Sequence, residues 1–293
     1  MKLSAALLFA AALLAPAAAA AADPVGTVWP AADRVPLDGV DHAPLTTLLA
    51  KYVDDDGFVD YRGWKASPAD RRALLAYLGA LGRGDPARPG SDAARLAFWI
   101  NAYNALTIEG ILRVYPTKSI REHTAALFGY NLWEDLPLRV GGGTYSLDAI
   151  EHEILRKLRE PRIHFAIVCA SVGCPTLRAE AFTAAKLEDQ LADQARDFFA
   201  RPKHFTFDAA ANTVTLSKIL DWFGEDFGDS PGAILRRVKP YLPADVREAA
   251  TAAGVRVRDI TTSQSSLEEI FTGLVRGDAD GGVEGRGLGK AAE

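Results

Sequence analysis

The sequence has little cysteine and no strong excess of charge of one sign. Its 293 residues include two cysteines, and 33 lysines and arginines stand against 38 aspartates and glutamates, which gives a formal net charge of −5. A mildly acidic chain of mixed charge has no electrostatic reason to bind nucleic acid or an anionic membrane surface. We therefore exclude nucleic acid and expect an unknown small molecule, a peptide or another protein as the partner.

The chain also lacks a hydrophobic run long enough to span a bilayer with ease, including the run at its start. Lys2 precedes an uncharged stretch over residues 3–14, and the alanines at 20–22 form an A-x-A site just ahead of Asp23. This order is typical of a cleavable secretory signal peptide, here residues 1–22. No cysteine lies near the junction for lipid attachment. We expect an exported protein, periplasmic or extracellular, with no membrane span after cleavage.

No internal repeat or long linker divides the rest of the chain, which favours a single domain. We place that domain at residues 41–274, after an extended leader at 23–40 that is punctuated by Pro and Gly. A tail rich in Gly and charge follows at 275–293, and we expect both ends to be disordered. The composition, with 48% hydrophobic residues, is sufficient for a sizeable core.

Hydrophobic spacing predicts an α+β fold, in which helices surround a small, mainly antiparallel sheet within one globular domain. A strongly apolar strand is predicted over residues 162–168, and it runs directly into the loop that holds both cysteines. One or two further helices are expected after residue 230. The other predicted helices cover residues 44–52, 70–81, 92–114, 148–158 and 186–199, and the predicted hairpins lie within 136–147 and 204–216.

The two cysteines, Cys169 and Cys174, are close in sequence. An oxidising compartment permits disulfides, and two cysteines in an exported chain pair more often than they stay free. The leading interpretation is therefore a structural Cys169–Cys174 disulfide that pins the loop. In that state neither sulfur can act as a nucleophile.

Four separated blocks of the sequence follow one another in the order of a known family. They are Phe98-Trp99-Ile100-Asn101-Ala102-Tyr103-Asn104, Ile150-Glu151-His152, the stretch from Ile163 to Cys174-Pro175, and Leu216-Ser217-Lys218-Ile219 with Trp222-Phe223 and Asp226-Phe227. In these blocks the chain resembles the DUF547 family, a domain of unknown function, over roughly residues 45–230. The resemblance implies a domain found in bacterial exported proteins and in plant proteins, without an established activity.

An alternative hypothesis is thiol catalysis, as in a hydrolase or acyltransferase with chemistry of the papain or transglutaminase kind. A cysteine thiolate would be activated by a histidine, which an amide or carboxylate would orient. Both histidines precede the cysteine in the chain, unlike the order in papain-like enzymes. The candidates are Cys169 as nucleophile, His164 or His152 as base, and Glu151, Asn101 and Asn104 as orienting groups.

The two asparagines support either hypothesis, since Asn101 and Asn104 are three apart and share one side of a predicted helix. They could orient an imidazole, or they could bind the backbone of a neighbouring loop and fix how it meets the helix. A metal site is a third possibility, but the spacing H-x4-C-x4-C matches no established zinc pattern. We expect no metal and no cofactor. Two functional classes stay open: a binding or scaffold domain, which is the first interpretation, and an enzyme.

Overall fold

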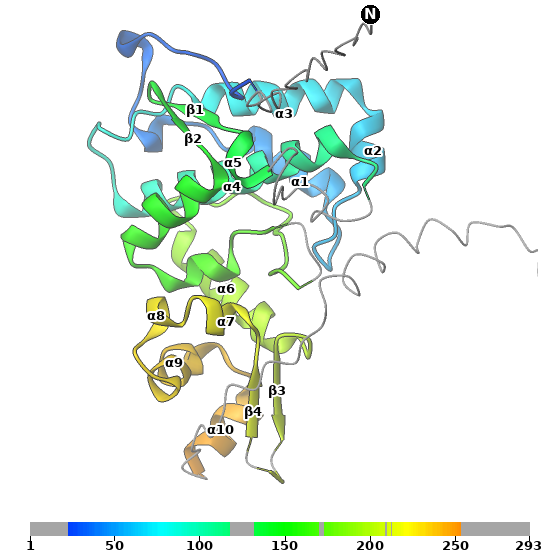
Figure 1. The fold of residues 1–293 in the computed structure, drawn as a ribbon, viewed down its shortest axis with the longest axis vertical. Coiled ribbons are helices and arrows are strands. Elements are labelled where there is room, and N and C mark those ends of the chain that lie inside the picture. The colour runs from blue at the N-terminus through cyan, green and yellow to red at the C-terminus, as the bar shows by residue number, and fades with distance from the viewer. Residues whose placement is uncertain (1–22, 118–131, 170–172, 209, 212, 253–293) are drawn as a thin grey trace, which may run out of the picture.

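Helices dominate the structure. The expected α+β class is confirmed, because the described helices are accompanied by two short antiparallel hairpins. The predicted signal peptide at 1–22 and tail at 275–293 lie outside the described residues. The computed structural model describes residues 23–117, 132–169, 173–208, 210–211 and 213–252 (Figure 1).

The first half of the chain forms a helical layer in the upper part of Figure 1. Proline at or next to the first position suits the start of two of its helices, because the fixed φ of proline matches the helix and its missing N–H is not needed there. The three helices predicted in this half are confirmed within two residues. The helices are α1 (Ala43–Tyr52), α2 (Tyr61–Ala66), α3 (Pro68–Leu81) and α4 (Asp92–Val114).

The long helix α4 lies at the centre of this layer. Ser91 begins it, since its Oγ accepts a hydrogen bond from the backbone N–H of Ala94 at 3.0 Å. Every residue from Leu96 to Leu112 is buried, including polar ones. A helix enclosed on all sides cannot leave its amides to water, so Asn101 and Asn104 need partners inside the protein.

The strands form two separate hairpins instead of one sheet. β1 (Leu138–Val140) pairs with β2 (Gly143–Tyr145), and β3 (Phe205–Asp208) pairs with β4 (Thr213–Leu216). Gly141 begins the first turn at a φ of +57°, a conformation that favours glycine. Both predicted hairpins are confirmed, and each packs on a different group of helices.

The leader is packed against the protein, so our expectation that residues 23–40 are disordered was wrong. Val25 pairs in parallel with Leu138, and Val35 pairs in parallel with Gly84. Leu37 is buried in the main core. Isolated apolar residues, separated by Pro and Gly, anchor the leader to the domain. Such single contacts produce no helical or strand periodicity in the sequence, so the packing could not be predicted from the pattern.

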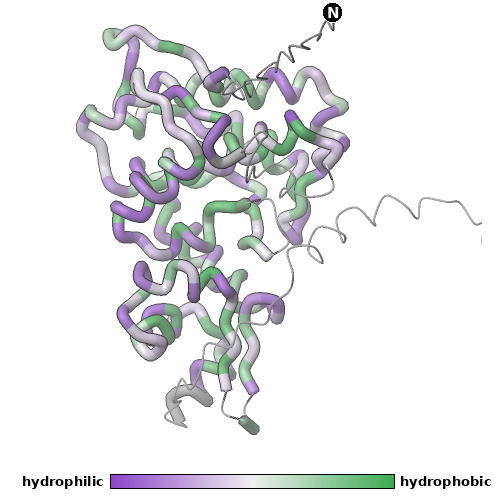
Figure 2. Tube along the Cα trace, viewed as in Figure 1, coloured by the Kyte–Doolittle hydropathy of each residue, from purple (hydrophilic) through white to green (hydrophobic). Residues whose placement is uncertain are grey.

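The second half of the chain forms the lower part of Figure 1 around a second apolar core. Its helices are amphipathic, and Figure 2 shows apolar and polar positions interspersed along them. The predicted helix at 186–199 is confirmed as α6, and the helices expected after residue 230 are present. The short helix α5 (Leu132–Asp135) precedes β1 and lies in the upper part of Figure 1. The helices of the second half are α6 (Leu187–Ala200), α7 (Ile219–Trp222), α8 (Gly224–Phe227), α9 (Pro231–Val238) and α10 (Ala244–Ala252).

The prediction of a strand over residues 162–168 is wrong. Pro161–Phe165 is a 3-10 helix, and Glu160 caps it by accepting a hydrogen bond from Arg162 N at 3.0 Å. A short apolar run does not distinguish a strand from a buried helical turn, and here Pro161 opens the turn. The predicted helix at 148–158 is helical, but Ala149–Leu155 adopts the rarer π form, which often occurs at functional sites.

No helix within the described part of the chain is both long and apolar enough to cross a membrane.

Candidate functional site

The cysteines lie in a stretch between α4 and α6, of which the structure describes residues 166–169 and 173–183; these residues we call the cysteine segment. Its described residues contain no helix or strand. Much of it is nevertheless buried, including Val168, Cys174 and Phe182. Buried backbone N–H and C=O groups require hydrogen-bond partners. The N–H groups of Ala166 and Ile167 bond the carbonyl oxygen of Ile163 at 2.9 Å each, and side chains supply further partners.

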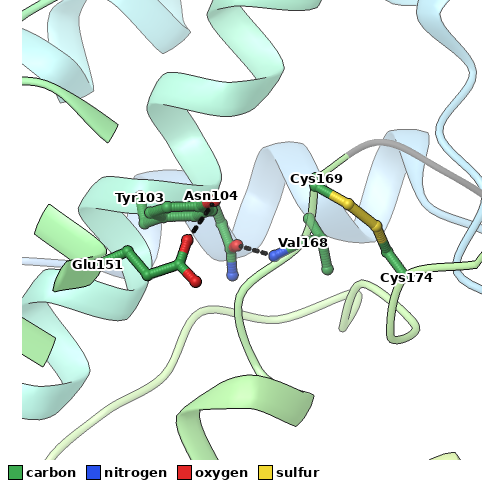
Figure 3. Close-up of a disulfide and its surroundings, with 6 residues drawn as sticks. All are labelled: Tyr103, Asn104, Glu151, Val168, Cys169 and Cys174. Atoms are coloured by element: carbon green, nitrogen blue, oxygen red, sulfur yellow. Dashed lines mark hydrogen bonds between the residues drawn. A yellow bond between two sulfur atoms is a disulfide. The ribbon is translucent and has the colours of Figure 1, made fainter. Parts of the chain in front are cut away.

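The α4 asparagines supply the first set of partners. Asn104 accepts a hydrogen bond from Val168 N at 3.0 Å (Figure 3). It also donates from Nδ2 to the carbonyl oxygen of Ala166 at 2.9 Å. Asn101 makes the same pair of bonds to one residue, Phe182, at 2.8 Å each. Each side-chain amide thus replaces the backbone of a neighbouring strand. Neither binds an imidazole through these bonds.

The second set comes from two glutamines of α6, which the sequence analysis missed. Gln194 Nε2 donates to the carbonyl oxygens of Phe165 and Thr176, at 3.0 and 2.7 Å. Gln190 Nε2 donates to the carbonyl oxygen of Ala181 at 3.0 Å. The signal in the sequence was two glutamines four residues apart on the apolar face of a helix.

The predicted disulfide is present. Cys169 and Cys174 are bonded, with their Cα atoms 6.1 Å apart, and neither of the chain's cysteines is free (Figure 3). Cys174 is buried. Both sulfurs are therefore part of the disulfide, which begins one residue after Val168, where Asn104 binds the backbone N–H.

The histidine at the cysteine loop is His204, which the sequence analysis did not consider. Its imidazole is hydrogen-bonded to the backbone of Cys174, and its ring stacks on Phe198 at 4.0 Å. Burial, together with the nearby cations of Lys203 and Arg201, lowers the pKa of His204 to about 3. A histidine with such a pKa is neutral at physiological pH.

His164, the first candidate base, has a carboxylate partner. Its Nε2 lies 2.7 Å from Asp226 Oδ2, its ring stacks on Phe223 at 4.2 Å, and its side chain is 1% exposed. Burial lowers the pKa of His164, although Asp226 opposes the shift. For the Asp226 carboxylate, burial alone would raise the pKa. Hydrogen bonds from Arg156 and His164 outweigh burial, so the pKa of Asp226 is lowered. The sequence analysis did not predict this cluster.

The two candidates on the π-helical turn have separate surroundings. Glu151 accepts a hydrogen bond from the hydroxyl of Tyr103 at 3.1 Å, and burial raises its pKa against the opposing effect of His152. His152 is 40% exposed, with Nε2 3.7 Å from Asp148 Oδ1. Figure 3 shows the Glu151 carboxylate pointing toward Tyr103, on the side of Asn104 away from the disulfide.

The predicted site residues thus fall into three groups. Asn101 and Asn104 hold the cysteine segment, and Glu151 with Tyr103 lies beside α4. His164 pairs with Asp226, and Arg156 joins Asp226 to His152, whose Nδ1 lies 3.3 Å from the Arg156 guanidinium. Within the described ranges, no group of three or more His, Cys, Asp or Glu side chains is arranged so that it could hold a metal ion.

Beside the cysteine segment is an open groove of about 620 Å³. It runs along residues 176–180, with the turn at 54–55 on one side and the charged face of α6 on the other. This volume lies within the usual range of ligand sites. The sequence analysis did not predict the groove, because its walls come from three distant parts of the chain.

These features define an α+β domain built around a disulfide-closed segment held by buried amides. Residues 89–199 match the family model described as "Protein of unknown function, DUF547". The match runs from just before α4 to the end of α6, so it includes the asparagines, the π-helical turn and the cysteine segment, and it confirms the resemblance for this stretch. No curated protein and no solved structure matches the chain.

Proposed function

We propose that this protein is an exported binding domain, in which the cysteine segment is the rigid frame of a recognition surface. The observation that carries the proposal is the Cys169–Cys174 bond, together with the amide bonds that hold the segment on both sides of it. A surface fixed before binding loses little conformational entropy when a partner arrives, which is the physical basis of preorganised recognition.

The alternative, a cysteine- and histidine-dependent hydrolase or acyltransferase, has less support. It needs a free thiolate at Cys169 and an imidazole able to take its proton. The two sulfurs form a disulfide with each other, and Nε2 of His164 is hydrogen-bonded to Asp226. The amides of Asn101 and Asn104 bind backbone groups. The residues named for catalysis therefore have structural partners.

Export is part of the proposal because it explains the redox state. Disulfides persist in the periplasm and outside the cell, whereas cytosolic thiols are kept reduced. The first 22 residues have the order of a signal peptide, and a bonded cysteine pair fits the compartment to which such a peptide directs a protein.

The experiment is to express the full chain in a bacterium with a periplasm, fractionate the cells, and measure the intact mass of the product with and without an alkylating agent in denaturant. We expect a periplasmic product that begins at Asp23 and gains no mass on alkylation unless a reductant is added first. A product that keeps residues 1–22, or that takes up two alkyl groups without reductant, would contradict the proposal.

A further inference from the structure

We infer that the open edge of β4 is an interaction surface and that its partner is the chain's own segment 254–258, which pairs with it as a third strand. The sequence of this segment is Gly-Val-Arg-Val-Arg, and it lies outside the described residues. The inference goes beyond the proposed function and is independent of it, because it concerns the β3–β4 hairpin and not the cysteine segment.

The pairing of β3 with β4 shows which backbone groups of β4 face away from the hairpin. In an antiparallel pair, residues whose backbone groups bond the partner strand alternate with residues whose groups point away. The N–H of Ser217 donates to the carbonyl oxygen of His204 at 2.8 Å, so Ser217 faces β3. By alternation Thr215 also faces β3, whereas Val214 and Leu216 direct their N–H and C=O groups to the open edge.

These outward groups are buried and lack partners. Val214 is 6% exposed and Leu216 is 3% exposed. Within the part of the chain that the structure describes, neither residue has a backbone hydrogen bond outside the hairpin. Nearly all buried backbone groups in native proteins are paired, so this edge requires donors and acceptors from elsewhere. An added strand supplies both at the correct spacing.

The edge of β3 does not have the same requirement. The N–H of Phe205, at the start of the strand, donates to the carbonyl oxygen of Arg201 at 3.2 Å. Thr206 and Asp208 are exposed, and a charged residue on an edge strand opposes further pairing. β4 instead alternates half-buried and buried positions along its whole length. The edge that needs a strand is therefore that of β4.

The sequence directly after α10 has the pattern of such a strand. α10 ends at Ala252. Gly254 stands where a glycine commonly allows the chain to turn after a helix. The next four residues alternate valine with arginine. A period of two with β-branched residues predicts a strand that has one apolar and one charged face.

The position of α10 and the faces of the sheet suit this partner. Val246 of α10 belongs to the same apolar core as Val214 and Leu216, and α10 and the hairpin both lie at the lower end of the molecule in Figure 1. The two valines of the segment would extend the apolar face of β4, and its arginines would lie on the outer face with Thr215. An edge covered in this way is also protected from pairing with another chain.

The experiment measures amide hydrogen exchange and NOE contacts in the full mature protein by NMR spectroscopy. Three proteins are compared. They are the wild type, the apolar-face variant Val255→Ser with Val257→Ser, and the control Arg256→Ser with Arg258→Ser, which changes the other face of the same segment. The amides of α4 report whether each protein is folded, and light scattering reports its mass.

In the wild type we expect a monomer in which the amides of Val214 and Leu216 exchange at least about 100-fold more slowly than in an unstructured chain. NOE contacts should join β4 to residues 254–258. The apolar-face variant loses buried valine surface, so these two amides should exchange at least about tenfold faster while α4 keeps its protection. The control should differ from the wild type by less than about threefold.

Unprotected amides at Val214 and Leu216 in the wild type, or the absence of NOE contacts between β4 and residues 254–258, would overturn the inference. Equal exchange in the two variants would also overturn it. Protection that falls on dilution of a dimer would assign the edge to a second copy of the chain, which is again contrary to the inference. If the apolar-face variant does not fold, the wild-type contacts decide the matter.

Discussion

Val168 donates its backbone N–H to Asn104 Oδ1 at 3.0 Å, and this bond joins the residue before the first cysteine to the buried helix α4. The same amide donates to the carbonyl oxygen of Ala166 at 2.9 Å. A single side chain thus satisfies two backbone groups of a segment that has no strand beside it.

Replacement of Asn104 by alanine tests this anchor. Asn104→Ala leaves the N–H of Val168 and the carbonyl of Ala166 buried without partners, and each unpaired group costs about 1–3 kcal/mol. We expect the free energy of unfolding, measured by urea titration, to fall by about 2–6 kcal/mol. The control Arg72→Ala, on the exposed face of α3, should change it by less than about 0.5 kcal/mol. A small loss in both variants would show that the anchor is unimportant.

The Cys169–Cys174 bond closes a very short ring, so its effect on stability should be modest. The chain-entropy relation gives about 2 kcal/mol for a ring of this size. Reduction, or the double change Cys169→Ser with Cys174→Ser, should lower the free energy of unfolding by that amount and leave the helical signal in circular dichroism intact. The same reductant should have no effect on the double variant. Loss of the whole fold on reduction would contradict this view of the bond as a local pin.

The pH dependence of stability should reflect His204. Its pKa is lowered from 6.5 to about 3 in the folded protein. Below pH 6.5 His204 is protonated in the unfolded chain, whereas in the folded protein it stays neutral down to about pH 3. The free energy of unfolding therefore falls as the pH is lowered from 6.5 to about 3. By pH 5 this one group should have cost about 2 kcal/mol.

His204→Phe keeps a ring that can stack on Phe198 and removes the titrating group. Its free energy of unfolding should decline less between pH 7 and pH 5 than that of the wild type, when both are measured by urea titration. Identical slopes for the two proteins would mean that His204 accepts a proton in the folded state, contrary to the burial that the structure describes.

Two neighbouring carboxylates offer a matched test of the His164 cluster. Asp226 binds both His164 and Arg156, whereas Glu225 binds only Arg156 and is 77% exposed. We expect Asp226→Asn to lower the thermal midpoint clearly, because it breaks a partly buried network and costs about 2–3 kcal/mol. Glu225→Gln should cost less than about 0.5 kcal/mol, since exposed ion pairs contribute little. Equal effects would show that Asp226 is no more than a surface charge.

The sequence predicts the outline of the fold because its elements are local. Ser91 marks the start of α4, the glycines at 141–143 mark a turn, and the spacing of Cys169 and Cys174 permits a bond. The error over 162–168 arose where several apolar residues alternate but have no strand to pair with. Periodicity reports which residues face the core, and it does not report whether a neighbouring strand exists.

The contacts that define the site could not be predicted from local sequence. Asp226 follows His164 by 62 positions, and their contact depends on how the two apolar cores meet. The asparagines were identified as buried amides, but their partners depended on the path of the cysteine segment. Gln194 was missed because a polar residue on an amphipathic helix is usually assigned to solvent.

The central claim is that the sulfurs are structural and do not form a catalytic site. The direct measurement uses Cys174→Ser, which leaves Cys169 as the single thiol, and follows its alkylation rate with iodoacetamide from pH 5 to pH 10. Our account predicts the profile of an ordinary thiol, with a midpoint near or above pH 8.5 that is unchanged by His164→Gln or His152→Gln. A midpoint below about pH 7 that moves upward when either histidine is replaced would reveal an activated thiolate and contradict the account.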